Sequence, residues 1–326
     1  MALPPILKDR LRLPVVASPM FILSNPDLVI AQCTSGIVGS FPSLNARPQP
    51  QLREWLTRIT EELAKHDANN PDAPSAPFAV NLIVHKSNDR LEEDLATIVE
   101  FEVPIVITSL GARTDVNDAI HSYGGIVLHD IINDLYAHKA IEKGADGLIA
   151  VSAGAGGHAG TQSPFALLQE IRQWFDGPVL LSGSIAHGRS ILAAQAAGAD
   201  LAYIGSAFIA TEEAGAVDGY KQMVVDSKAD DIVYSNLFTG MHGNYLRGSI
   251  SAAGLDPENL AVSDPSTMNI ASGASGGSGS IRAWRDVWGA GHGIGAIDAV
   301  VPTVDLIARL EDEYNIAWDT LLLKQN

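Results

Sequence analysis

The chain has 326 residues, 46% of them hydrophobic, so it is long enough for two ordinary domains or for one α/β barrel. Its 38 acidic and 21 basic side chains give a formal net charge of −17, which argues against partners such as nucleic acid or an anionic membrane surface. The single cysteine, Cys33, excludes an intrachain disulfide. No signal peptide and no apolar run of membrane-spanning length is present, so we expect a cytoplasmic protein.

Short apolar segments alternate with longer amphipathic segments over the first two thirds of the chain. The predicted strands are apolar on both faces, which is typical of a parallel sheet covered by helices: 13–18, 36–41, 78–84, 104–108, 126–129, 148–152, 179–182 and 202–205. The predicted helices lie between them: 26–34, 50–66, 88–100, 113–122, 133–143, 163–174 and 187–198. Eight strands in strict alternation with helices predict an α/β fold, a (β/α)8 TIM barrel.

The pattern changes beyond the eighth predicted strand. Residues 206–225 and 296–312 have helical patterns, whereas 226–290 are irregular and include the Gly/Ser-rich stretch 272–280. We therefore divide the chain into a barrel at 1–210, a small, mainly helical cap over the barrel mouth at 211–290, and a C-terminal segment at 291–326 that returns to the barrel. A flexible surface excursion is the alternative interpretation of the middle part.

Two glycine-containing turns follow the seventh and eighth predicted strands. They contain Ser182, Gly183 and Ser184 in the first turn, and Gly205 and Ser206 in the second. Small residues let backbone N–H groups converge on an anion, and TIM barrels commonly bind phosphate after strands seven and eight. The pair of turns therefore predicts a phosphate site, with ordinary turn chemistry as the alternative.

The segment after the sixth predicted strand carries a single histidine among small residues. Ser152 ends the strand, and Gly156 and Gly157 precede His158. The glycines allow the backbone to approach a flat ligand, and an imidazole titrates near neutrality and suits proton abstraction. We predict His158 as a general base; a hydrogen-bonded loop histidine is the alternative.

The exit of the first strand offers an apolar wall for the same site. Pro19, Met20 and Phe21 follow that strand, and Asn81 lies on the third strand, where its amide can bond a heterocycle. The composition is equally compatible with purely structural roles, in which Met20 packs in the core and Asn81 caps the end of a strand. No spacing typical of a metal site, a Walker loop or a Gly-x-Ser-x-Gly elbow occurs.

These motifs together resemble those of the nitronate monooxygenase family, formerly called 2-nitropropane dioxygenase. The resemblance covers essentially the whole chain. It rests on the run AGAGGHAG at 153–160, the two glycine turns, Ser18-Pro19-Met20, Val80-Asn81-Leu82, and WGAGHG at 288–293. It implies a TIM barrel that binds FMN non-covalently, a smaller helical domain over the flavin, and His158 as the catalytic base.

The resemblance also implies which residues hold the cofactor. The phosphate would be held by Ser182, Gly183, Ser184, Gly205 and Ser206. The ring system or ribityl chain would be contacted by Pro19, Met20, Phe21, Asn81, Gly156 and Gly157. Asp130 and Ser152, at the ends of the fifth and sixth strands, complete the predicted cofactor site.

The implied reaction is the oxidation of an alkyl nitronate or nitroalkane by O2 to a carbonyl compound and nitrite. One departure concerns His129-Asp130, because some relatives acting as NADH:quinone reductases carry a His-Lys pair there. A carboxylate in place of that cation argues against the quinone-reductase interpretation. The alternatives are an FMN-dependent NAD(P)H:quinone or enoyl reductase, and a non-redox barrel for a phosphorylated metabolite. The physiological substrate and a homodimer are left open.

Overall fold

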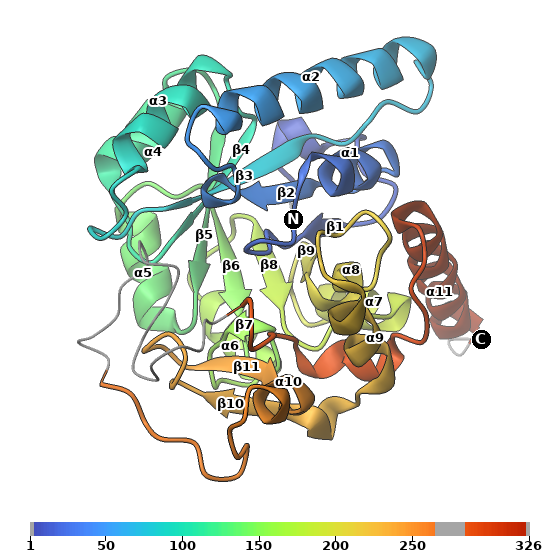
Figure 1. The fold of residues 1–326 in the computed structure, drawn as a ribbon. Coiled ribbons are helices and arrows are strands. Elements are labelled where there is room, and N and C mark those ends of the chain that lie inside the picture. The colour runs from blue at the N-terminus through green and yellow to red at the C-terminus, as the bar shows by residue number, and fades with distance from the viewer. Residues whose placement is uncertain (1–2, 265–283, 324–326) are drawn as a thin grey trace.

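The computed structural model describes residues 3–264 and 284–323 (Figure 1). Its main sheet contains β1 (Val15–Ala17), β2 (Gly39–Pro42), β3 (Phe78–Ile83), β4 (Ile105–Ser109), β5 (Ile126–Ile131), β6 (Gly147–Val151), β8 (Val179–Ser182) and β9 (Leu201–Ile204). The strands are parallel in the order β1-β9-β8-β6-β5-β4-β3-β2, and a bridge between Val16 and Val38 joins the two ends. The sheet is therefore an eight-stranded barrel, as the sequence predicts.

Helices cover the outside of this barrel (Figure 1). They are α1 (Pro26–Thr34), α2 (Gln51–Asn69), α3 (Leu91–Glu100), α4 (Thr114–His121), α5 (Asp134–Glu142), α6 (Pro164–Ile171), α7 (Gly188–Ala196) and the short α8 (Ser206–Ile209). The cysteine lies in α1 and is fully buried. No helix in the described parts of the chain combines the length and apolarity needed to cross a bilayer.

Two apolar layers hold the barrel together, and alternate strand residues belong to different layers. Inside the barrel, Ile105 and Ile107 pack with their counterparts on other strands, and Leu7 from the N-terminal segment joins them. Between them along the same strand, Val106 packs outward with residues of the covering helices. Side chains alternate across a strand, so every second residue near the carboxyl end of a strand points into the barrel mouth.

The segment after β9 contains structure that the sequence analysis did not predict. Residues 206–225 form α8 and α9 (Asp218–Asp226) with a non-helical stretch between them. The irregular region contains β10 (Ile232–Ser235), β11 (Gly243–Leu246) and α10 (Arg247–Ala252), and these strands form an antiparallel sheet with β7 (Gly157–His158). The stretch 272–280 lies outside the described residues. The division into three parts remains a prediction.

The C-terminal helix also begins later than predicted. Residues 292–296 form a 3-10 turn, and α11 (Thr303–Leu323) follows it, in place of one helix at 296–312. Pro302 stands directly before α11, a position where proline is compatible with the start of a helix but not with its interior. α11 packs against α7 and α1, so the end of the described chain returns to the barrel wall.

Candidate active site

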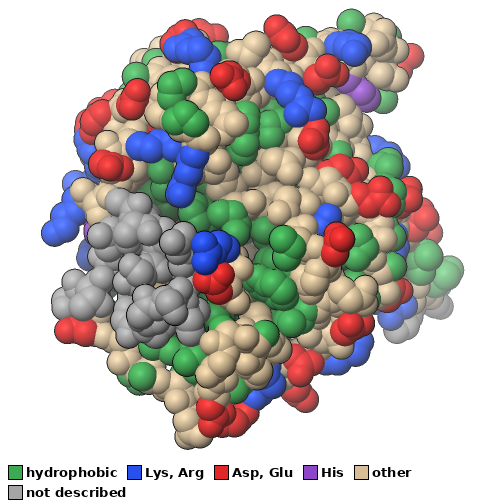
Figure 2. Space-filling view, viewed as in Figure 1, with side chains coloured by type: hydrophobic (Ala, Val, Ile, Leu, Met, Phe, Trp, Pro, Cys, Tyr) green, Lys and Arg blue, Asp and Glu red, His purple; other side chains and the backbone are tan. Residues whose placement is uncertain are grey.

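A cavity of about 290 Å3 opens where the strands end, between the barrel and the segment after β9. Hydrophobic side chains gather in the middle of the face in Figure 2, and charged side chains lie mainly around them. The described lining residues include Asp130 and His158 but no lysine or arginine. Cavities of this kind, apolar with a few convergent polar groups, are typical ligand sites.

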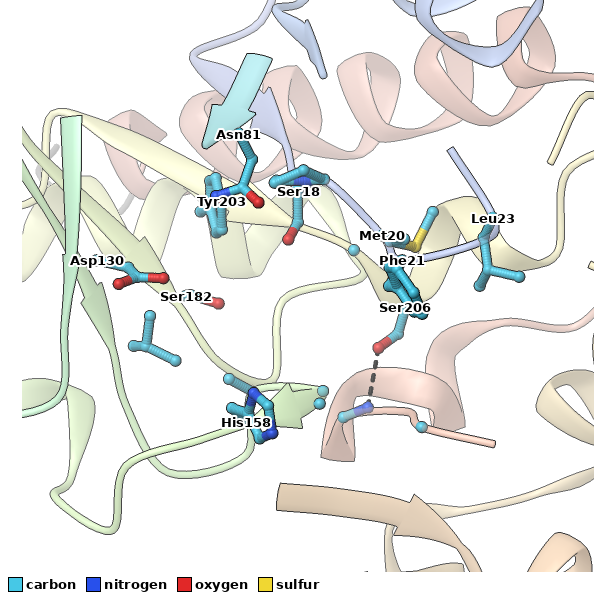
Figure 3. A pocket seen from close by; sticks show the side chains of 18 of the residues that line it. Ser18, Met20, Phe21, Leu23, Asn81, Asp130, His158, Ser182, Tyr203 and Ser206 are labelled. Carbon is cyan, nitrogen blue, oxygen red and sulfur yellow. Dashed lines mark hydrogen bonds between the residues drawn. The ribbon is translucent and has the colours of Figure 1, made fainter. Parts of the chain in front are cut away.

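Almost all residues predicted for the site line this one cavity (Figure 3). They are Pro19, Met20, Phe21, Asn81, Asp130, Gly156, Gly157, His158, Ser182, Gly183, Ser184, Gly205 and Ser206. Ser152 is the exception: it is fully buried, and its hydroxyl donates to the carbonyl oxygen of Ser182 over 2.7 Å. Ser152 therefore supports the first glycine turn from behind. His85, His242 and His292 are not among the lining residues.

A chain of polar groups crosses the ends of β3, β4 and β5. Asn81 Nδ2 donates to the carbonyl oxygen of Ile107 over 3.0 Å and to Ser109 Oγ over 2.8 Å. The Ser109 hydroxyl and the Leu110 amide in turn hydrogen-bond the carboxylate of Asp130. Asn81 is thus held by its nitrogen, and its oxygen points toward the cavity (Figure 3). This wall offers one amide oxygen and one carboxyl group to a ligand.

Burial controls the charge of Asp130 and of its neighbour. It raises the pKa of Asp130 above the ordinary 3.8, although His129 and the two hydrogen bonds act in the opposite direction. Burial also lowers the pKa of His129, whose Nδ1 lies 2.6 Å from Thr108 Oγ1. The pair is therefore biased toward a neutral acid beside a neutral imidazole, which limits the negative charge at the cavity wall.

His158 enters the cavity from the opposite side (Figure 3). It lies on the two-residue strand β7, where its backbone pairs with Gly243 of β11. Its Nε2 is 2.9 Å from Thr239 Oγ1, and its ring meets Trp284 edge-on with centroids 5.5 Å apart. Burial lowers the pKa of His158 from 6.5 to about 4, so the ring is neutral at physiological pH. A neutral imidazole can accept a proton.

The two glycine turns provide unpaired backbone donors at the other end of the cavity. In the described chain, the N–H groups of Gly183, Ser206 and Ala207 donate to no protein acceptor. Ser206 Oγ instead accepts from the Gly291 amide over 2.8 Å, which ties the C-terminal part to the turn. Gly183 has φ +134°, and a Cβ there would lie 2.5 Å from Ser152 Oγ. The turn therefore requires glycine, and its free amides suit an anion.

Three non-glycine residues of the cavity wall have left-handed backbone conformations. Leu110, Ser184 and Trp284 all have φ between +58° and +68°, and all three line it. The left-handed conformation costs a non-glycine residue about 1–2 kcal/mol. Such strain is typical of sites where the backbone holds a functional group in place, as at Leu110, whose amide reaches Asp130.

Comparison with known proteins identifies the family. The family model described as nitronate monooxygenase matches residues 5–313. The chain belongs to the nitronate monooxygenase family. This is a family of flavin-dependent oxidoreductases. A nitronate monooxygenase from Paraburkholderia phytofirmans is 25% identical, and the alignment covers 92% of each chain.

Other proteins similar to this chain carry different names. A (3aS,4S,5R,7aS)-5-hydroxy-7a-methyl-1-oxo-octahydro-1H-indene-4-carboxyl-CoA dehydrogenase from Rhodococcus jostii is 25% identical over 74% of this chain and 68% of its own. The solved structure of a nitroalkane oxidase from Streptomyces ansochromogenes has a TM-score of 0.77 at 22% identity, covering 97% of this chain and 99% of that one. FabK from Thermotoga maritima has a TM-score of 0.75, also at 22% identity, with 97% and 96% covered. These structures show a shared fold.

Several cavity residues of this nitronate monooxygenase family member were not predicted from its sequence. Tyr203 of β9 lines the cavity and is buried, and burial followed by the nearby Asp130 charge raises its pKa. It stands two residues after Leu201, which packs inside the barrel, so strand alternation could have identified it. Thr239 and Trp284 come from the irregular region, where no periodicity marks them.

Proposed function

We propose that this protein binds FMN in the cavity and oxidises alkyl nitronates or nitroalkanes with O2 to a carbonyl compound and nitrite. The observation that carries the proposal is the convergence on one cavity of a neutral, half-buried histidine, an apolar wall and two turns with free amides. Family membership supports a flavin as the redox group. The protein's contribution is then to position the substrate and the base.

The cavity walls fit the parts of FMN. The free amides of Gly183, Ser206 and Ala207 would hold the phosphate without cationic side chains. Pro19, Met20 and Phe21 line the cavity as an apolar strip against which a flat ring can pack. The oxygen of Asn81 is available to an N–H of the ring, since its nitrogen is already bonded. Bound FMN would accept electrons from the nitronate and pass them to O2.

The role proposed for His158 is to take the α-proton of a neutral nitroalkane. Its depressed pKa keeps it unprotonated over the whole range in which the protein is expected to work. Burial of the His158 ring beside Trp284 would limit access of water to the proton being moved. An already ionised nitronate needs no such base, so the two substrate forms should depend differently on this residue.

The test begins with the purified flavin-loaded protein and propyl-2-nitronate without oxygen. We expect bleaching of the flavin absorbance, and nitrite when the same mixture is exposed to air. His158→Asn should lose turnover of 2-nitropropane by about a hundredfold or more, the usual contribution of a general base, and lose far less with the nitronate. The matched control is His66→Asn, which removes a histidine of α2 that does not line the cavity. The proposed activity is rejected if the flavin does not bleach without oxygen and no nitrite forms in air.

A reductase acting on a thioester is the second candidate, because a carboxyl-CoA dehydrogenase is among the relatives. Against it, the described cavity lining contains no lysine or arginine to pair with the phosphates of a CoA carrier. Rapid bleaching of the flavin by NADH or NADPH, with no response to nitronate, would favour the reductase. A colourless protein that releases no flavin on denaturation would instead favour a non-redox barrel.

A further inference from the structure

The hydroxyl group of Thr239 occupies a position with three hydrogen-bonding neighbours. It donates to the carbonyl oxygen of Met241 over 3.0 Å, accepts from the Met241 amide over 3.3 Å, and lies 2.9 Å from His158 Nε2. The side chain of Thr239 is 7% exposed, so water does not replace these partners. The local turn at 239–241 therefore fixes the direction in which this hydroxyl points.

Counting donors and acceptors determines which nitrogen of His158 carries the proton. A threonine hydroxyl has one hydrogen and two lone pairs. Here the hydrogen goes to the Met241 carbonyl, and one lone pair takes the Met241 amide. The remaining lone pair can only accept, so His158 must donate from Nε2. The opposite arrangement would leave the Met241 carbonyl without this donor.

The other ring nitrogen of His158 is then the free one. Nδ1 has no hydrogen-bond partner among the described residues, and it is not one of the buried, unpartnered polar atoms. It is therefore open to the cavity that the side chain lines. With the proton on Nε2, the lone pair of a neutral imidazole is on Nδ1.

The same segment also holds the backbone around His158. Asn244 Nδ2 donates to the carbonyl oxygen of Ala155 over 2.6 Å, and the Tyr234 hydroxyl donates to that of Ala159 over 2.9 Å. The β7–β11 pairing lies between these two contacts. The backbone on both sides of the ring and the ring's own Nε2 are thus anchored to the segment after β9.

We propose that Thr239 is a positioning residue that holds the His158 ring with its proton on Nε2, so that Nδ1 is the atom that takes the substrate proton. The second half of this statement rests on the proposed function; the first half does not. The threonine itself supplies no reacting group. Its role is to keep one of two tautomers in place.

Two matched variants separate the hydrogen bond from packing. Thr239→Val removes the hydroxyl at nearly constant shape, and Thr239→Ser retains it. A third, Tyr245→Phe, removes the buried Tyr245 hydroxyl beside Thr239, which has no other hydrogen-bond partner, and so tests whether that hydroxyl competes with His158 for the threonine oxygen. Thr239→Ala serves as a second deletion if the valine variant does not fold.

The first measurement is the tautomer of His158, by long-range ¹H–¹⁵N spectra of histidine-labelled protein as purified, assigned by loss of the signal in His158→Asn. We expect the Nε2–H form in the wild type, Thr239→Ser and Tyr245→Phe, and a shift toward Nδ1–H in Thr239→Val. The second measurement is the ratio of turnover with 2-nitropropane to turnover with its nitronate. We expect that ratio to fall on the order of tenfold in Thr239→Val, the effect of one hydrogen bond, and to be restored by serine.

An Nδ1–H tautomer in the wild-type protein overturns the proposal. So does a valine variant with the wild-type tautomer and the wild-type substrate ratio. If the protein oxidises neither compound, the function proposed above fails, but the tautomer spectra still decide the role of Thr239. If Thr239→Val loses turnover equally with both substrates and keeps the wild-type tautomer, the threonine has only a packing role.

Discussion

The depressed pKa of His158 makes a quantitative prediction about stability and pH. In the folded protein the pKa is about 4, against 6.5 for an unperturbed histidine. Between pH 4 and pH 6.5 this histidine is protonated in the unfolded chain but not in the folded protein. The free energy of unfolding therefore falls as the pH falls from above 6.5 toward 4. Above pH 7 the histidine is unprotonated in both the folded and the unfolded state, so it no longer contributes to the pH dependence.

The magnitude follows from the two pKa values. At pH 5 the unfolded histidine is almost fully protonated and the folded one is about nine-tenths neutral, which corresponds to a loss of about 2 kcal/mol relative to pH 8. Because the ring lines a cavity that water can enter, about 2 kcal/mol is the upper bound. His158→Asn removes this loss, since asparagine does not titrate.

The assay is urea unfolding of flavin-free protein at pH 8 and pH 5, so that ligand binding does not contribute to stability. The quantity compared is the difference in unfolding free energy between the two pH values, in the wild type and in His158→Asn. Subtraction removes the contributions of His129 and Asp130, which titrate in both proteins. Gly219→Ala, which changes no titratable side chain, is the control and should keep the wild-type difference. A His158→Asn protein that also keeps it would refute the depressed pKa of His158.

Three further variants test other parts of the structure. Gly183→Ala places a Cβ 2.5 Å from Ser152 Oγ at φ +134°, so we expect FMN to bind at least about tenfold more weakly, measured as flavin retained and by fluorescence titration. Asp130→Asn removes a carboxyl group whose pKa is raised by burial above 3.8; because the unfolded chain ionises first, the wild type should lose stability relative to the variant as the pH rises above 3.8, which unfolding curves from pH 3 upward measure. Gly188→Ala brings a Cβ within 2.2 Å of the Tyr314 amide nitrogen and should destabilise the α7–α11 contact by about 3 kcal/mol, whereas Gly219→Ala, whose Cβ meets nothing closer than 3.6 Å, should leave thermal unfolding nearly unchanged.

The barrel was predictable because its strands carry a strong local pattern. Each is buried on both faces, and each is separated from the next by a helix of recognisable period. Helix α1 has the predicted bounds because Asn25 caps its first turn and Pro26 occupies its first position. The site residues at the ends of the strands could be predicted for the same reason. Once the strands are located, their carboxyl ends define the edge of the barrel where the site lies.

The segment after β9 was less predictable because its strands depend on distant partners. β10 and β11 have four residues each, and β11 pairs with β7, which has only two and lies more than eighty residues earlier in the chain. Such short segments have no period long enough to distinguish them from loops. Thr239 could not be identified for the same reason: its importance comes from a contact with His158 that only the folded chain creates.

The net charge of −17 and an anionic cofactor can coexist because the charge lies away from the cavity. Among the described lining residues, Asp130 is the one carboxylic acid, and burial biases it toward the neutral form. His158 is neutral as well, so the cavity itself carries little charge. Surface carboxylates more than about 8 Å away are screened at physiological salt. An anion at the two glycine turns therefore meets the partial positive charges of free amides rather than the protein's net charge, and the same neutrality leaves His158 able to accept a proton.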